Sequence, residues 1–485
     1  MAEWNKLAYK PIKEWKDIQL TNLRYVSRFL LPFQPFVQNH PEKSKYLSVR
    51  SLKDFQKLPF TSKLDLLPTE TNPKRSRDFI LQPSIELIRK AWPKSAVLSL
   101  GLKKLFGTDV KAELSHEFKP VHIHFTTGRS TSQIPFLYTA KDLETLRESG
   151  GRVFETIGAT SDDIAINAFP FAPHLAFWLA YNTTTSKNMM TLQTGGGKIL
   201  GTRKIMDAIE NLQATILIIM PGYGYHLLRE AVAEKRNFSS LRIIVFGGER
   251  VSPGLRRKVK SLLNKLGAKH TKVLSTYALT EAKTAWVQCH EESGYHLYPD
   301  LEMIELVDRH GNPVKEGSSG EIVYTSLGWR GSVVTRYRTG DFCKKMIITA
   351  PCDHCGRTTP RLHSSIERRS DMVELNLTKV KGELVNLNAL HSIMHEIPSI
   401  EEWQAEVRKK NDDPYEIDEL ILNIAFTDEK VRENDMALLQ SLLQRDMGIS
   451  ATINSKPLKE VIQLLGLETE LKEKRIVDRR KEIRK

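Results

Sequence analysis

Largely apolar runs that alternate with helical segments constrain the fold of this chain most strongly. Residues 214–220 (ATILIIM) end at a proline, and residues 241–246 (LRIIVF) end at paired glycines. Runs of this kind indicate strands buried on both faces of a parallel sheet. Helical patterns cover residues 225–235 and 253–266, and Gly267 stands where a helix of the second pattern would end. The alternation of strand and helix predicts an α/β fold with mainly parallel sheets.

The pattern changes twice along the 485 residues, a length that accommodates two or three packing units. After about residue 301, short strands at residues 303–307 and 321–324 flank a turn-forming cluster, which indicates hairpins. From about residue 369 a small α+β pattern begins. We therefore expect a large N-terminal domain at residues 1–368 and a small C-terminal cap domain at residues 369–485.

Composition narrows the class of protein. Hydrophobic residues make up 40% and charged residues 27%, as in soluble globular proteins. The longest apolar run is far shorter than the roughly 20 residues that cross a bilayer, and the N-terminus lacks a signal-peptide core, so we expect a cytoplasmic protein with no membrane partner. Residues 472–485 contribute +5 of the net charge of +14. We interpret this segment as a solvated terminal helix or tail and expect no nucleic-acid partner.

Four polar loops are expected at the ends of predicted strands, at the sheet edge where α/β proteins bind ligands. The hydroxyls and cation of residues 126–131 (TTGRST) suit phosphates, and the glycines of residues 247–249 (GGE) allow close approach of a flat ligand. Residues 276–281 (TYALTE) combine an aromatic ring with a carboxylate, and the carboxylate of RYRTGD at residues 336–341 could bind ribose hydroxyls. Each segment taken alone is better explained as an ordinary capped loop or a salt bridge. Residues 195–198 (GGGK) lack the spacing of a nucleotide-binding motif and are interpreted as a flexible turn.

The cysteines indicate a metal site rather than disulfides. Cys352 and Cys355 have the spacing of a zinc knuckle, and Cys289 and His296 lie upstream. This set predicts a structural zinc ion held by three thiolates and one imidazole. Reduced, buried thiols are the alternative.

Taken together and in this order, the motifs resemble the adenylate-forming superfamily, and within it the phenylacetate–CoA ligase family. The pieces that carry the resemblance are LPFTSKLDL (58–66), the loop at Thr126 followed by YTAKDL (138–143), GGE, TYALTE, GYHL (294–297) with Asp300, GEIVYT (320–325), RYRTGD, CGRTTPR (355–361) and IERRSD (366–371). The resemblance implies a large N-terminal AMP-binding domain and a mobile cap. It also implies a reaction in which ATP, Mg²⁺ and a carboxylic acid give an acyl-adenylate, which coenzyme A then attacks.

The resemblance assigns roles to individual residues. The triphosphate would be held by Thr126, Thr127, Gly128, Arg129 and Thr131. The adenine would lie against Gly247, Gly248, Glu249, Tyr277 and Ala278, and Asp341 would hold the ribose. Thr280 would contact the α-phosphate, Glu281 would bind Mg²⁺, and Lys472 would be the adenylation lysine. Arg369 would reach the nucleotide near the hinge, and Asp371 would be the hinge itself.

The acid and the acyl acceptor remain open at this stage. Phe171, His174 and Tyr223 fall in the region that forms the acid pocket in the resembled family, and they are equally compatible with core positions. An amine or a protein thiol could replace coenzyme A as acceptor. A nucleotide-binding protein without catalysis is a further alternative, suggested by Phe125 and Leu471 where the family usually has glycine. The sequence does not distinguish a monomer from a homodimer.

Overall fold

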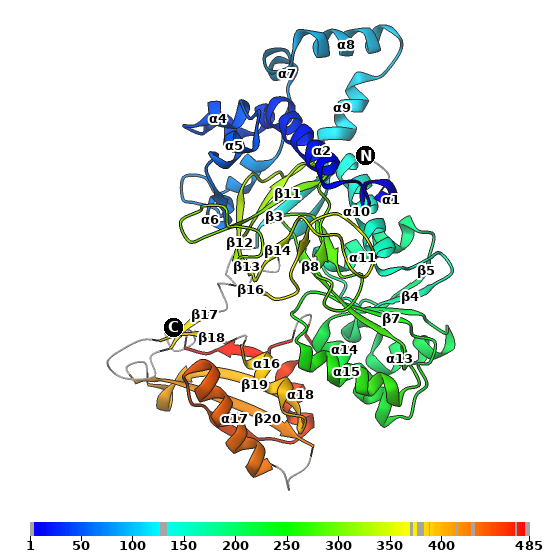
Figure 1. Ribbon diagram of the computed structural model, residues 1–485, viewed down its shortest axis with the longest axis vertical. Helices are drawn as coiled ribbons and strands as arrows, with labels where there is room; N and C mark the ends of the chain where they lie inside the picture. The colour runs from blue at the N-terminus through cyan, green and yellow to red at the C-terminus, as the bar shows by residue number, and fades with distance from the viewer. Residues whose placement is uncertain are drawn as a thin grey trace. The chain divides into compact units, whose positions relative to one another are not determined.

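The computed structural model describes residues 4–126, 133–368, 372–375, 383–387, 389–413, 416–427, 432–470 and 473–480 (Figure 1). The chain divides into two compact units, each built from separate stretches. Unit 1 comprises residues 1–162, 173–190 and 276–366, and unit 2 comprises residues 163–172, 191–275 and 367–485. Among the described helices, none combines the length and the apolar character that crossing a bilayer requires.

Unit 1 begins with a run of short helices whose apolar residues share one core with the strands that follow. These are α1 (Trp4–Leu7), α2 (Ile12–Tyr25), a π-helical turn (Val26–Leu30), a 3₁₀ turn (Leu31–Phe33), α3 (Pro35–Asn39), α4 (Lys43–Leu47), α5 (Leu52–Gln56), α6 (Lys63–Leu66), a 3₁₀ turn (Arg75–Phe79), α7 (Ile85–Ala91), α8 (Lys94–Leu105) and α9 (Val110–Phe118). The start of α6 is fixed locally, because Ser62 and Asp65 form a capping box there.

The sheets of unit 1 are largely antiparallel. One has the strand order β1 (Thr61–Ser62), β13 (Tyr337–Cys343), β12 (Gly320–Ser326), β11 (Glu302–Val307), and β1 is parallel to β13. Smaller sheets are formed by β2 (Pro120–Phe125) with β3 (Pro135–Thr139), and by β10 (Tyr295–His296), β15 (Arg361–Leu362) and β14 (Met346–Ile347). Helices α10 (Ala140–Ile157) and α11 (Leu175–Ser186) also belong to this unit. Chain segments distant in sequence thus meet in one core.

The predicted parallel sheet lies mainly in unit 2, in the order β5 (Met190–Gln193), β4 (Ile164–Asn167), β6 (Ile216–Ile219), β7 (Ile243–Phe246), β8 (Lys272–Leu279). The end of β8 belongs to unit 1 and pairs antiparallel with β9 (Thr284–Val287). Every residue of β6 and of β7 is buried, because helices pack on the sheet. The helices of this part are α12 (Gly197–Leu200), α13 (Thr202–Asn211), α14 (Pro221–Ala233) and α15 (Pro253–Lys265). Gly267 has a φ of +83° just after α15, as the helix-end signal predicts. The α/β fold class is confirmed.

The C-terminal part of unit 2 is built on a four-stranded sheet in the order β21 (Thr452–Ser455), β20 (Asp418–Phe426), β19 (Ile400–Lys409), β22 (Ile476–Asp478). It also contains β17 (Met372–Leu375), β18 (Glu383–Asn386), α16 (Ala389–Glu396), a 3₁₀ turn (Lys410–Asp412), α17 (Arg432–Met447) and α18 (Leu458–Leu465), and β16 (Ile366–Arg368) leads into it. The antiparallel pair β19–β20 carries the core residues of this sheet.

Four local predictions are wrong. RYRTGD is not a loop, because residues 337–343 form β13, and TYALTE is a loop only at its end, because β8 continues to Leu279. Gly197 and Lys198 of GGGK begin a short helix, α12, whereas Gly195 and Gly196 precede it outside regular structure. The described part of the basic C-terminal segment is not a solvated tail: β22 pairs in parallel with β19, and Arg475 is buried against Glu402.

Candidate active site

The two most specific sequence motifs of unit 1 meet through their side chains. The Tyr277 hydroxyl in β8 donates a hydrogen bond of 2.8 Å to Oδ2 of Asp341 in β13. Asp341 is buried, and its backbone N–H donates to the Thr339 hydroxyl. The Tyr277 ring stacks on Trp286 at a centroid distance of 5.4 Å. Tyr277, predicted to contact the adenine, and Asp341, predicted to hold the ribose, are therefore neighbours. The stacked tyrosine ring and the carboxylate lie side by side.

A strained backbone and a buried cation fix the RYRTGD strand. Arg336 has a φ of +44° and is 1% exposed, and its guanidinium pairs with Glu305 at 3.1 Å. The same guanidinium donates to the Leu58 carbonyl at 2.8 Å and lies 4.0 Å from the Phe60 ring centroid. LPFTSK and RYRTGD, about 280 residues apart, thus form one structural unit. Gly340, with a φ of +75°, lies just before Asp341 in β13, where the pairing of β13 with β12 is irregular.

The predicted magnesium ligand lies at the end of the β8 segment. Glu281 is half-buried, and its Oε1 accepts a hydrogen bond of 3.1 Å from the Tyr337 hydroxyl. Thr280 precedes it and is also half-buried, whereas Ala278 is exposed. A carboxylate that is oriented by a hydrogen bond and remains partly exposed is a suitable oxygen ligand for Mg²⁺.

A buried ion pair beside this segment was not predicted. Lys283 and Asp142 are both fully buried, with 2.8 Å between Nζ and Oδ2. Burial lowers the pKa of Lys283. Asp142 also accepts from the backbone N–H groups of Arg330 and Gly331. The pair ties α10 to the chain just after Glu281; its sequence signal is the acidic residue of YTAKDL.

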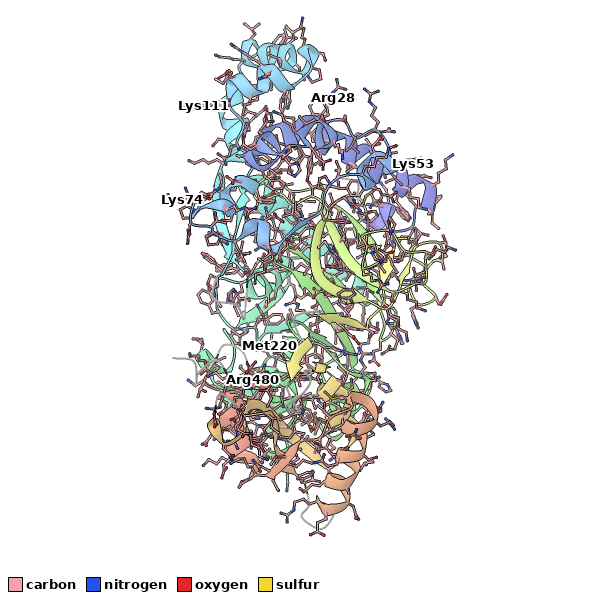
Figure 2. All side chains as sticks on the ribbon, turned by 90° about the vertical axis from the view of Figure 1, so that its left-hand side faces the viewer. Arg28, Lys53, Lys74, Lys111, Met220 and Arg480 are labelled. Carbon is pink, nitrogen blue, oxygen red and sulfur yellow. The ribbon has the colours of Figure 1, made fainter. Side chains whose placement is uncertain are left out.

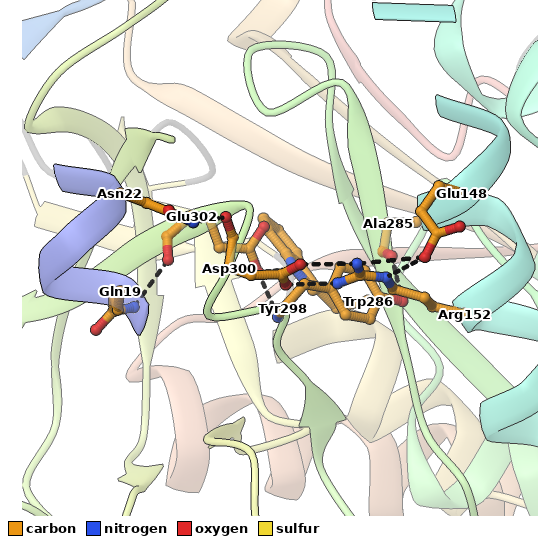
Figure 3. Close-up of polar contacts among 9 residues, drawn as sticks. All are labelled: Gln19, Asn22, Glu148, Arg152, Ala285, Trp286, Tyr298, Asp300 and Glu302. Carbon is orange, nitrogen blue, oxygen red and sulfur yellow. Dashed lines mark hydrogen bonds and ion pairs between the residues drawn. The ribbon is translucent and has the colours of Figure 1, made fainter. Parts of the chain in front are cut away.

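Figure 3 shows a second buried network, behind Trp286. Arg152 donates to both carboxylate oxygens of Asp300, at 2.6 and 2.8 Å, and both residues are buried. Asp300 was singled out by the resemblance, and its partner Arg152 was not. Such a bidentate pair fixes geometry as well as charge.

Glu302 completes the network of Figure 3. Its Oε1 accepts from Trp286 Nε1 at 2.5 Å and from the Tyr298 backbone N–H at 2.8 Å. Its Oε2 is buried and has no hydrogen-bond partner in the part of the chain that the structure describes. Burial raises the pKa of Glu302 to about 8. A neutral glutamic acid therefore supports the tryptophan on which Tyr277 stacks.

Unit 2 holds the predicted adenine segment and part of the predicted acid pocket. Gly247 and Glu249 follow β7 directly, and Gly248 between them has a φ of +86°. Tyr223, near the start of α14, is buried and makes a 3.1 Å hydrogen bond with the Thr202 hydroxyl.

The remaining acid-pocket candidates differ in exposure and in position along the chain. Phe171 belongs to unit 2 with Tyr223 and is 58% exposed, so it is not a core residue. His174 belongs to unit 1 and hydrogen-bonds through Nδ1 to the Phe125 carbonyl at 3.0 Å. A pocket in unit 2 is lined by Tyr223 together with residues 195–198 and Glu473. The GGGK segment thus borders a pocket, which the sequence did not predict.

The four predicted zinc ligands gather in unit 1. Their ligand atoms all lie within 4.8 Å of one another, in the set Cys289, His296, Cys352 and Cys355. The Sγ atoms of Cys289 and Cys352 are 3.6 Å apart, and Cys355 Sγ lies 3.6 Å from His296 Nε2. Tetrahedral coordination with Zn–S bonds of about 2.3 Å places sulfurs about 3.8 Å apart, so the cluster fits a metal of this kind. The pairing of β10 with β15 brings the two halves of the cluster together.

Several predicted site residues lie outside the described residues. These are Thr127, Gly128, Arg129, Thr131, Arg369, Asp371 and Lys472. Thr126, which precedes them, is buried, and its hydroxyl accepts from the Ile134 backbone N–H at 3.1 Å. The roles assigned to the undescribed residues stay predictions.

Comparison with known proteins agrees with these motifs. A family model described as "AMP-binding enzyme" matches residues 139–330. A phenylacetate-coenzyme A ligase of Thermus thermophilus is 26% identical over 320 residues, which are 64% of this chain and 67% of that protein. The enzyme of the same name from Escherichia coli is 25% identical over 260 residues, 52% of this chain and 56% of that protein. The matched stretches thus span between about half and two thirds of these relatives.

Solved structures extend the likeness to nearly the whole chain. A crystal structure of a 2-hydroxyisobutyryl-CoA ligase in the postadenylation state has a TM-score of 0.75 and 19% sequence identity, and covers 99% of this chain and 93% of that one. At this identity the likeness concerns the fold, which is that of a large domain followed by a smaller one. The family model, these relatives and the fold agree with the motifs: the chain is similar to AMP-binding enzymes, and the relatives named here are phenylacetate-coenzyme A ligases.

Proposed function

We propose that this chain activates a carboxylic acid with MgATP to an acyl-adenylate, releases pyrophosphate, and transfers the acyl group to coenzyme A. The observation that carries the proposal is the hydrogen bond between Tyr277 and Asp341. Glu281 follows Tyr277 by four residues, and a hydrogen bond from Tyr337 holds its carboxylate. An aromatic face, a carboxylate for vicinal hydroxyls and an oxygen ligand are what an adenosine phosphate requires. Relatives named phenylacetate-coenzyme A ligase support coenzyme A as the acceptor.

The first half-reaction is a displacement at the α-phosphorus of ATP. A carboxylate oxygen of the acid forms a bond to that phosphorus as the bond to pyrophosphate breaks. Asp341 would hold the ribose hydroxyls, and Thr280 would donate to the α-phosphate. Glu281 would hold Mg²⁺, which neutralises charge on the phosphate oxygens. Lys472 would stabilise the negative charge that develops on the attacked phosphate.

The second half-reaction would use the same adenylate. The coenzyme A sulfur would attack the acyl carbon, and AMP would leave with the electron pair of the broken acyl–oxygen bond. We propose that the domains bounded at residues 368 and 369 reorient about Asp371 between the two steps. Thr126, Thr127, Gly128, Arg129 and Thr131 would hold the triphosphate in the first step. Arg369 would contact the nucleotide.

We further propose that the four-residue Cys/His cluster holds a structural zinc ion. Cys289, Cys352 and Cys355 would bind as thiolates and His296 through Nε2. The donor set of three sulfurs and one imidazole nitrogen suits zinc, and complete coordination by protein ligands suits a structural site. The ion would fasten the CGRTTPR segment to the chain around β10.

A pyrophosphate-release assay over aryl, indolyl and medium-chain acids tests the activity. We expect release with at least one acid, and AMP and an acyl thioester only when coenzyme A is added. Lys472→Ala should abolish release while leaving the Kd for ATP nearly unchanged. Lys474→Ala is the matched control, because this side chain is 57% exposed two residues away. ATP binding without release for any acid would refute the proposed reaction, and transfer to added amino acids in place of coenzyme A would refute the proposed acceptor.

A further inference from the structure

Helix α8 presents an uncovered apolar stripe. None of its residues is buried. Leu98, Leu102 and Leu105 are 67%, 54% and 83% exposed, and Phe106 at the C-terminal cap is 84% exposed. Their spacing of four, seven and eight residues places all four on one helical face. Single exposed apolar residues are ordinary, whereas an aligned stripe of this kind indicates a contact surface.

The chain that leads into α8 and the helix that follows it, α9, both pack on the core of unit 1. Trp92, before α8, donates from Nε1 to the Phe29 carbonyl at 2.9 Å, and its ring packs 5.6 Å from that of Phe33. Phe118, at the end of α9, packs against the same Phe33 ring at 5.8 Å. On the helix itself, Val97 and Leu100 are partly buried against the core of unit 1. The segment that carries α8 is thus anchored before and after the helix, and α7 and α8 extend away from the sheets of this unit (Figure 1).

The residues around the stripe are predominantly basic. Residues 85–113 contain six lysines and arginines and three acidic residues. Lys103 pairs with Glu113 at 2.9 Å. Lys90, Lys94, Lys104 and Lys111 are exposed and form no ion pair with the described residues; Figure 2 labels Lys111 on α9.

We propose that this surface, the α8 stripe with its flanking lysines, docks on an anionic membrane surface. An apolar face bordered by lysines is the pattern of a helix that lies in a lipid interface. Anionic headgroups complement the basic flanks, at about 1 kcal/mol per lysine near the surface. A second copy of the same helix would bring Lys94 and Lys104 toward like charges, which disfavours self-association through this face. The contact departs from the expectation of no membrane partner, which rested on the lack of a long apolar segment; an interfacial helix needs none.

Vesicle flotation of the full chain tests this inference. We expect binding to phosphatidylcholine vesicles that contain phosphatidylglycerol, weaker binding at high salt, and little binding to phosphatidylcholine alone. Leu105→Ser with Phe106→Ser should weaken binding at least about tenfold. Leu438→Ser, at a position 47% exposed on α17, is the apolar control.

A charge series provides a second, independent readout. Lys94→Ala and Lys104→Ala should each weaken binding about fivefold. Lys53→Ala, an exposed lysine of α5, should not. Equal binding of neutral and anionic vesicles would overturn the proposal. So would the absence of vesicle binding, or a dimer in sedimentation that dissociates in the Leu105→Ser, Phe106→Ser variant while vesicles are not bound.

Discussion

Replacing Glu302 by glutamine should change the pH dependence of stability in a direction that the structure determines. Burial raises the pKa of Glu302 to about 8, against an ordinary value of 4.5. Between these values the unfolded chain has an ionised glutamate while the folded chain must keep a proton. The stability that the neutral side chain contributes is complete below about pH 4.5. It is lost progressively as the pH rises through about 8.

The size of the effect follows from the two pKa values. Each pKa unit between the unfolded and the folded value corresponds to about 1.4 kcal/mol of unfolding free energy. The whole pKa difference therefore corresponds to about 5 kcal/mol. Between pH 5 and pH 8, the wild type should lose about 3.5 kcal/mol relative to the glutamine variant. Glutamine is a fair substitute, because it keeps an oxygen for Trp286 Nε1 and the Tyr298 N–H and does not ionise.

The measurement is urea unfolding at pH 5, 6.5 and 8, followed by tryptophan emission. We expect the free energy of unfolding of Glu302→Gln minus that of the wild type to increase steadily over this range. Glu14→Gln, at a side chain 51% exposed, is the control and should show a difference within about 0.5 kcal/mol at every pH. A difference for Glu302→Gln that does not change with pH would mean that the glutamate is ionised in the folded protein, and the reasoning would be refuted.

Three further outcomes are expected. Asp341→Ala should raise the KM for ATP about 10- to 100-fold, because a buried polar contact to the ribose is lost, and steady-state pyrophosphate release measures this; an unchanged KM contradicts the ribose role. Metal analysis should find about one zinc per chain, and Cys352→Ser or chelation should lower the Tm; less than about half an equivalent counts against the site. Gly340→Ala should lower the free energy of unfolding by about 1 kcal/mol, because the φ of Gly340 is +75°; the new Cβ has no neighbour within 4 Å, so the cost comes from the backbone alone. Gly101→Ala is the control: it lies inside a helix, its Cβ also has no neighbour within 4 Å, and the change should be neutral or stabilising.

The candidate site could be predicted in its residue types but not in its local conformation. RYRTGD was interpreted as one of the polar loops at the ends of predicted strands, yet residues 337–341 belong to β13. Its polar groups are satisfied by partners far along the chain: Arg336 by Leu58 and Glu305, and Asp341 by Tyr277. Tertiary hydrogen bonds outweigh local propensity at such positions. The glutamate of TYALTE, in contrast, lies outside regular structure, as its local pattern predicts.

What the sequence by itself determined is the set of features carried by short-range patterns. The apolar runs that became β6 and β7 and the glycine that ends α15 depend on neighbouring residues only. Only the tertiary structure decided which buried charges meet, such as Arg152 with Asp300, 148 residues apart, and Lys283 with Asp142. Local sequence does not tell which opposite charge each of them meets, because the charge that compensates the lost hydration of a buried group comes from a distant part of the chain.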